Sequence, residues 1–166
     1  MADAVDLIIE QWRRERPGTD SWPMGVVGRI NRLSRLLDRE LKDFFARYGL
    51  EFWEADVLYT LRRSGPPYAL TAGALNRSSM VTSGAITNRI DRLAAKGLVE
   101  RVADDKDRRT VLVRLTEQGH AKVEETIDAH VANEARILGA LGPGARDELT
   151  GALRVLLEAL DDTSLS

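Results

Sequence analysis

The sequence predicts a mainly α-helical protein built on a winged helix-turn-helix, with a small β-hairpin wing and long dimerisation helices at both ends. Two short amphipathic helices joined by a tight turn fit residues 71–96. Within residues 98–115, alternating apolar and polar residues flank a charged loop, which is the pattern of a hairpin. Long segments with apolar residues at helical spacing lie before and after this part. At 166 residues, the chain is expected to form one domain over residues 1–166.

Residues 1–48 are predicted to form two helices. A short amphipathic helix over residues 3–15 ends before Pro17, and a turn-rich linker continues to residue 23. A long helix follows over residues 24–48, and Gly49 stops it. Its apolar stripe consists of Ile30, Leu33, Leu37, Leu41 and Phe44. The stripe fits either a fold-back onto the chain's own core or contact with a second copy.

Residues 51–116 are predicted to form the winged helix-turn-helix. Its first helix, EFWEADVLYTLRRSG, is closed by Gly65 and by the two prolines that follow. Thr71 then stands where its hydroxyl can cap the next helix by accepting a bond from a free backbone N–H. These two helices are the support on which a reading helix would sit.

The reading helix itself is expected to be capped by Thr82 and to stop at Gly97, because glycine tolerates the left-handed exit conformation. Its apolar face carries Ile86, Ile90 and Leu93. Its other faces carry the side chains predicted to approach base edges in the major groove, which are Ser83, Thr87, Asn88 and Arg92. All four are hydrogen-bonding residues of useful length for that task.

The wing is predicted from the strand-like runs LVERVA and TVLVRL and from the charged tip between them. Lys106, Arg108 and Arg109 in that tip are predicted to contact the DNA backbone or the minor groove. A charge run alone indicates only a solvated loop. The position of this one, directly after a reading helix, favours the DNA contact.

Residues 117–166 are predicted to form two dimerisation helices. Thr116 begins a helix that continues to about Leu141, and the GPG sequence at 142–144 breaks it. The last helix is rich in leucine, at positions 149, 153, 156, 157 and 160. A small core would not cover that face, so we expect a twofold homodimer whose reading helices recognise a palindrome.

Charge is distributed unevenly along a chain whose formal net charge is only -2. Residues 71–116 hold nine Arg or Lys against five Asp or Glu, whereas residues 117–166 hold four against ten. The positive field is therefore expected at the winged helix-turn-helix, where it would attract the phosphates of double-stranded DNA. The first eighteen residues lack the apolar run of a signal peptide, and no segment fits a membrane span, so we expect a cytoplasmic protein.

Other classes of function are less consistent with the residues. An enzyme would need a nucleophile with a paired base, a phosphate-binding glycine loop or metal-ligand spacing, and we identify no catalytic residue, no cofactor motif and no metal site. His120 and His130 stand alone in a chain without cysteine. The competing class is a winged-helix protein–protein interaction module. Such a module gives no reason for basic residues on both the reading helix and the wing.

The segments PYALT, MVTSGAITNRIDRL, GLVERV and DKDRRTVLVRLTEQG resemble the MarR family of bacterial transcription regulators. The resemblance extends over nearly the whole chain. It implies a winged-helix dimer that represses a nearby gene and is released by a small molecule, a metal or an oxidant. The extra helix at residues 3–15 resembles the PecS-like, urate-responsive branch, which implies a urate or xanthine effector.

That resemblance implies a ligand site at Trp12, Asp56, Arg63 and Arg89. Trp12 offers a flat face for a purine, and an arginine offers a planar fork for an oxyanion. Asp56 and Arg63 are two helical turns apart and so share a face. Each residue alone has a simpler interpretation, such as a packing anchor, an interhelix ion pair or a phosphate contact. Tricarboxylates such as aconitate or citrate, or phenolic acids, are the alternative effectors.

Overall fold

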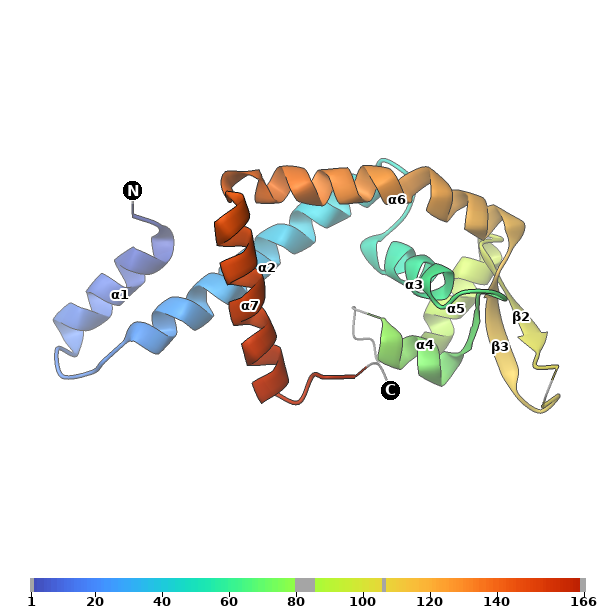
Figure 1. Ribbon diagram of the computed structural model, residues 1–166, viewed down its shortest axis with the longest axis horizontal. Helices are drawn as coiled ribbons and strands as arrows, with labels where there is room; N and C mark the ends of the chain where they lie inside the picture. The colour runs from blue at the N-terminus through green and yellow to red at the C-terminus, as the bar shows by residue number, and fades with distance from the viewer. Residues whose placement is uncertain (1, 80–85, 106, 165–166) are drawn as a thin grey trace. The chain divides into compact units, whose positions relative to one another are not determined.

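The computed structural model describes residues 2–79, 86–105 and 107–164 (Figure 1). Its elements in order are α1 (Ala4–Glu15), α2 (Trp22–Ala46), α3 (Phe52–Arg63), β1 (Ala69–Thr71), α4 (Ala72–Ser78), α5 (Ile86–Ala95), β2 (Val99–Ala103), β3 (Val111–Leu115), α6 (Glu117–Ile137), the short 3-10 helix η1 (Leu138–Ala140) and α7 (Pro143–Ala159). The chain divides into two units, Met1–Phe44 and Phe45–Ser166, which are described separately.

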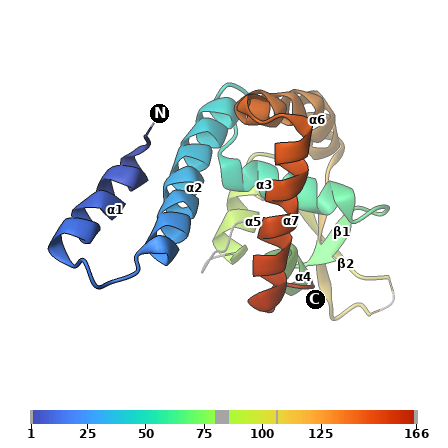
Figure 2. The same cartoon turned by 60° about the vertical axis from the view of Figure 1, so that its left-hand side comes forward.

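In the first unit, α1 packs beside α2 through apolar side chains and glycine. Val5 and Ile9 are the buried residues of α1. A Cβ atom at Gly28 of α2 would lie 3.3 Å from the Val5 side chain, so the absence of a side chain there allows the two helices to approach closely. Figures 1 and 2 both show the two helices side by side.

Charged contacts at the start of α1 reinforce that packing. The Asp3 carboxylate caps α1 by accepting the backbone N–H groups of Val5 and Asp6, at 2.7 and 3.0 Å. Arg29 of α2 binds both carboxylates, with Nε 2.8 Å from Asp3 and Nη2 2.5 Å from Asp6. The predicted short N-terminal helix is therefore present, and it is anchored to α2 at its first turn.

The long helix α2 begins two residues before the predicted start and ends two residues before the predicted end. Pro23 lies in its first turn, where a missing N–H costs no intrahelical bond. Gly49 follows with a φ of +70°, the left-handed value expected of a helix stop. Large apolar side chains stay exposed along this unit: Leu7, Ile8, Trp12, Trp22, Met24, Val26, Val27, Ile30, Leu33 and Leu36.

The core of the second unit lies between α3, α4, α5, α6 and the sheet. Its fully buried large apolar side chains include Phe45, Leu58, Leu61, Leu75, Ile90, Leu93, Val113 and Val123. Helix α3 supplies two of them, Leu58 and Leu61, and its residues 54–58 are all buried. The Phe45 ring lies 5.9 Å from that of Phe52 and 5.0 Å from that of His130, so His130 is a member of this aromatic cluster.

The sheet has three antiparallel strands in the order β1-β3-β2, one more than the two-stranded wing that the sequence predicted. Figure 2 labels the two outer strands, β1 and β2. The additional edge strand β1 pairs with β3, with Leu70 opposite Val113. β2 and β3 form the predicted hairpin, with Arg101 opposite Val113. Thr71, the last residue of β1, also caps α4 by accepting the N–H of Ala74 at 3.1 Å. The sheet thereby positions the helix-turn-helix.

Helices α6 and α7 complete the second unit. Thr116 caps α6 as predicted, accepting the Gly119 N–H at 3.0 Å. α6 ends at Ile137, earlier than the predicted Leu141, because η1 tightens the last turn. Gly142 and Pro143 then begin α7, which has no buried residue. Its exposed apolar side chains are Leu149, Leu153, Val155, Leu156, Leu157 and Leu160.

Candidate nucleic-acid interface and effector site

Helix α5 presents a polar face away from the core. Ile90 and Leu93 are buried on its inner side, and Thr87 and Asn88 are exposed. Their hydroxyl and amide groups can donate to and accept from base edges. Ser83, which was predicted to join them, lies outside the described residues, as does the predicted cap Thr82. Thr87 and Asn88 are therefore accessible in the described part of the reading helix, and their contact with base edges stays a prediction.

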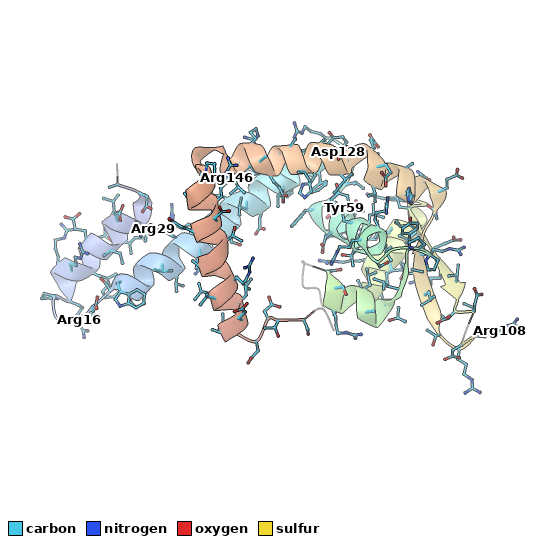
Figure 3. All side chains as sticks on the ribbon, viewed as in Figure 1. Arg16, Arg29, Tyr59, Arg108, Asp128 and Arg146 are labelled. Carbon is cyan, nitrogen blue, oxygen red and sulfur yellow. The ribbon has the colours of Figure 1, made fainter. Side chains whose placement is uncertain are left out.

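The wing tip is a turn that its own residues hold in place. The Asp107 carboxylate accepts the backbone N–H of Arg109 and the hydroxyl of Thr110, both at 3.0 Å. Arg108 and Arg109 are exposed, and Figure 3 shows Arg108 at the outer end of the hairpin. Lys106 lies outside the described residues. The turn needs neither arginine side chain, which leaves both available for a phosphate or a groove.

One ion pair joins the reading helix to the wing, and a second joins it to the start of α3. Asp91 of α5 lies 2.7 Å from the guanidinium of Arg101 on β2. Arg92, predicted to approach the bases, lies 2.5 Å from the carboxylate of Glu51 at the start of α3. Arg92 is therefore paired with Glu51 in this structure, and a contact between Arg92 and a base would have to be made in the presence of this ion pair.

Two of the four predicted effector residues lie on one face of α3. The Asp56 side chain is buried, and the residue is only 8% exposed. One turn further on, Thr60 accepts a bond from Arg63 at 3.2 Å, and Arg63 also donates to the carbonyl oxygen of Ser78 in α4. Arg63 thus links α3 to the end of α4, and its exposed guanidinium borders the helix-turn-helix.

Arg89, the third predicted effector residue, stacks on an aromatic ring that sequence reasoning did not single out. Its guanidinium carbon lies 5.1 Å from the centre of the Trp53 ring. Trp53 precedes Asp56 by three residues on α3, so this spacing is the signal that could have identified it. The structure thus gives Arg89 a cation–π contact with the start of α3.

Trp12, the fourth predicted effector residue, belongs to the first unit. It lies on α1 and is 42% exposed. Asp56, Arg63 and Arg89 belong to the second unit. The participation of Trp12 in a site with the other three residues therefore stays a prediction.

The two histidines each lie beside a glutamate on α6. His120 is 3.9 Å from Glu124, and His130 is 3.4 Å from Glu134. Over the described ranges, no cluster of three or more His, Asp or Glu side chains is arranged to hold a metal ion. None of the helices in those ranges has the length and apolarity that a bilayer crossing requires.

Comparisons with known proteins match both the winged helix-turn-helix and the flanking helices. A model of the MarR family matches residues 48–110. The regulator PecS of Dickeya dadantii, an HTH-type transcriptional regulator, is 41% identical over 92% of this chain and 90% of its own.

Solved structures agree with this similarity. A mutant of MarR from E. coli, complexed with operator DNA, superimposes with a TM-score of 0.71 at 25% identity, over 94% of this chain and 99% of its own. BpsR of Bordetella bronchiseptica, described with a mechanism by which 6-hydroxynicotinic acid regulates its DNA binding, gives a TM-score of 0.70 at 26% identity, over 79% and 91%.

These similarities extend across the whole fold rather than a single motif, and the regulators concerned are not enzymes. With a reading helix, a wing and flanking helices of this form, the chain belongs to the MarR family of DNA-binding transcription regulators and is PecS-like.

Proposed function

We propose that this regulator is a repressor that binds a palindromic operator as a homodimer and is released by a small planar anion, with urate or xanthine as the effector. The observation that carries the effector assignment is the buried carboxyl of Asp56 on α3, on the same face as Arg63, in a chain 41% identical to PecS. A buried carboxylate responds strongly to a new negative charge nearby, since the surroundings screen that charge poorly.

The DNA part of the proposal rests on exposed side chains of two elements. Thr87 and Asn88 on α5 would enter the major groove, and Arg108 and Arg109 on the wing would reach the backbone or minor groove. Ser83, Arg92 and Lys106 were predicted for the same interface from the sequence. The related MarR from E. coli, whose structure contains operator DNA, supports this use of the fold.

The homodimer rests on apolar surface. Helix α7 has no buried residue although it and its C-cap Leu160 carry six large exposed apolar side chains, and α1 and α2 carry ten more. Isolated chains rarely leave so much apolar surface in water, and a twofold partner is the commonest cover. A dimer would also place two reading helices one turn of DNA apart, as a palindrome requires.

In the proposed mechanism, the effector binds the released form of the dimer more tightly than the DNA-bound form. Trp12 would stack on its planar ring, Arg63 would hold its anionic edge, and Asp56 would lie close enough to respond to the added charge. Arg89, which lies on the reading helix, would carry the change to the DNA-reading surface. A ligand shifts such an equilibrium only through this difference in affinity.

A mobility-shift assay with the DNA upstream of the protein's own gene tests the proposal, using urate, xanthine, citrate and aconitate as additions. We expect urate or xanthine to dissociate the complex. Trp12→Ala and Arg63→Ala should lose that response and keep DNA binding, whereas Arg89→Ala should lose both. Dissociation by citrate or aconitate alone would contradict the purine assignment and leave the regulator assignment intact. A Trp12→Ala protein that responds to urate like the parent would exclude the α1 part of the site.

A further inference from the structure

The start of α3 holds the reading helix through an aromatic ring. Two guanidinium groups of α5 lie over the Trp53 ring, with the Arg89 and Arg92 carbons 5.1 and 4.8 Å from its centre. Both distances are within the range in which a ring attracts a cation. Arg89 and Arg92 are three residues apart, so they leave α5 on the same side.

Glu51 binds both Trp53 and Arg92, so the three side chains contact one another. The Trp53 indole N–H donates to one carboxylate oxygen of Glu51 at 2.7 Å, and Arg92 donates to the other at 2.5 Å. The indole N–H and then Arg92 hold the pKa of Glu51 below its ordinary range, which keeps the carboxylate charged. Glu51 therefore fixes the tryptophan and the arginine relative to each other.

A third cation, on the residue that directly follows α5, binds the same end of α3. Lys96 lies 2.6 Å from the carboxylate of Glu54, whose side chain is completely buried. Lys96 follows Arg89 and Arg92 at helical spacing, so all three cations share one side of α5. We call the set formed by Glu51, Trp53 and Glu54 on α3 the α3 anchor.

The α3 anchor restricts the rotation of α5 about its axis, which the apolar contacts of α5 do only weakly. Ile90 and Leu93 bury the inner side of α5, but apolar attraction is non-directional and resists a small rotation weakly. Three cations bound at fixed points set the rotation of the helix about its axis. That rotation decides where Thr87 and Asn88 point.

We propose that Trp53 and Glu51 are positioning residues that hold α5 in its DNA-reading orientation through Arg89 and Arg92, and that the effector acts by drawing Arg89 off the Trp53 ring. The second half rests on the proposed function, whereas the first half does not involve the effector. A guanidinium can stack on a ring and bind an anion at its edge at the same time, as Arg92 does with Trp53 and Glu51. The effector therefore draws Arg89 off the ring only by binding it nearer to Asp56 than the stacked position allows. An effector that binds Arg89 only after its guanidinium has left the Trp53 ring binds the released state more tightly than the DNA-reading state.

The test measures operator affinity by fluorescence anisotropy for Trp53→Leu, Trp53→Phe and Glu51→Gln, first without effector. We expect Trp53→Leu to weaken binding by about tenfold or more, because leucine offers no negative ring face. Trp53→Phe keeps that face and should recover most of the affinity. Glu51→Gln keeps the size but removes the charge, and it should weaken binding by about threefold.

The matched control is Tyr68→Leu. Tyr68 also lies under a guanidinium, that of Arg62 at 5.1 Å, in the same unit but with neither residue on α5. This variant should bind the operator like the parent. Circular dichroism and sedimentation should show unchanged fold and assembly for every variant compared. If Trp53→Leu does not fold, Glu51→Gln decides the question.

A second measurement separates positioning from general stability. Trp53→Leu should still bind urate by calorimetry, while urate should no longer change its operator affinity. Parent-like operator affinity in Trp53→Leu would overturn the positioning role. If that variant does not fold, parent-like affinity in Glu51→Gln would overturn it instead. Equal losses of affinity in Trp53→Leu and Trp53→Phe would also overturn it. If the parent ignores urate and Trp53→Leu still binds DNA weakly, the proposed effector fails and the positioning role is supported. Undiminished urate sensitivity in Trp53→Leu would overturn the Arg89 step.

Discussion

At the scale of single residues, the backbone of Arg109 takes part in the turn of the wing, whereas its side chain does not. Asp107 builds the turn by binding the backbone N–H of Arg109 and the hydroxyl of Thr110. The side chain of Arg109 takes no part in these bonds and is exposed. A change of that side chain therefore tests DNA contact without disturbing the turn.

We predict that Arg109→Ala weakens operator binding by about 1–3 kcal/mol, the usual cost of a lost groove contact. Anisotropy titrations at fixed salt concentration measure this loss. Lys122→Ala is the control, because it removes the same charge from α6, where Lys122 pairs with Glu125. Equal affinities of Arg109→Ala and the parent would exclude the wing role assigned to Arg109.

At the scale of elements, the junction between the sheet and α6 depends on a close backbone approach. A Cβ atom at Gly119 would lie 1.9 Å from the Leu98 carbonyl oxygen, which is far inside contact distance. The same carbonyl accepts the N–H of Thr116 at 3.2 Å, so α6 begins against the strand that leads into the wing. Only glycine fits there without movement of one of the two segments.

We predict that Gly119→Ala lowers the free energy of unfolding by about 1–3 kcal/mol, since the clash involves backbone rather than a flexible side chain. Thermal unfolding followed by circular dichroism measures the change. In Gly73→Ala, the new Cβ meets only the end of Arg77 at 3.5 Å, and alanine favours a helix, so this control should be at least as stable as the parent. Equal melting temperatures for Gly119→Ala and the parent would contradict the close approach.

The attachment of α1 to α2 should depend on pH. The backbone N–H groups of Asp6 and Val5, and then Arg29, hold the pKa of Asp3 below its ordinary range. The backbone N–H of Asp3 and then Arg29 do the same for the pKa of Asp6. Groups with depressed folded pKa values stabilise fully above the unfolded pKa, which is about 4 for aspartate. That stabilisation is lost as the pH falls through the lower folded values.

We therefore predict that α1 loses hydrogen-exchange protection as the pH falls below about 4, when protection factors are corrected for intrinsic exchange. The double variant Asp3→Asn, Asp6→Asn should show weak protection at neutral pH and little further change on acidification. Protection of α1 that is the same at pH 6 and pH 3 in the parent would exclude these two carboxylates as the cause.

The local parts of this fold could be predicted from the sequence. Thr71, Thr116, Gly49 and Gly97 mark helix ends through bonds and backbone angles that involve near neighbours. β1 could not be predicted, because a three-residue strand is defined by its partner β3 rather than by its own pattern.

The candidate site also has a part that could be predicted from the sequence and a part that could not. Asp56 and Arg63 are related by spacing on a single helix, which the sequence displays. The contact of Glu51 with Arg92 joins residues 41 positions apart, so only the folded chain reveals it. Trp53 has a helical spacing from Asp56 that the sequence displays, but its contacts with Arg89 and Arg92 likewise appear only in the folded chain.

At the scale of the whole molecule, exposed apolar surface supports the proposed homodimer. Among the described residues, six large apolar side chains of α7 and its C-cap stay at least a third exposed, and full burial of such a group stabilises by about 1.5–3 kcal/mol. A partner that covers even part of this surface would offset the entropy lost on association. The acidic excess of residues 117–166 keeps the same region from competing for phosphate.

We predict that truncation after Gly144, which removes nearly all of α7, abolishes the dimer and with it the recognition of both halves of a palindrome. Sedimentation velocity and anisotropy on full and half operators measure the two effects. A matched variant, with Thr163 and the three residues after it removed, keeps α7 and should behave as the parent. A truncated protein that remains a dimer and binds the full palindrome would place the interface elsewhere.

The most direct test of the central claim is the reciprocity between effector and operator. Anisotropy gives the operator Kd with and without saturating urate, and calorimetry gives the urate Kd with and without saturating operator. We predict that urate weakens operator binding by about 5- to 150-fold and that operator weakens urate binding by the same factor. An operator Kd that is identical with and without bound urate would contradict the account.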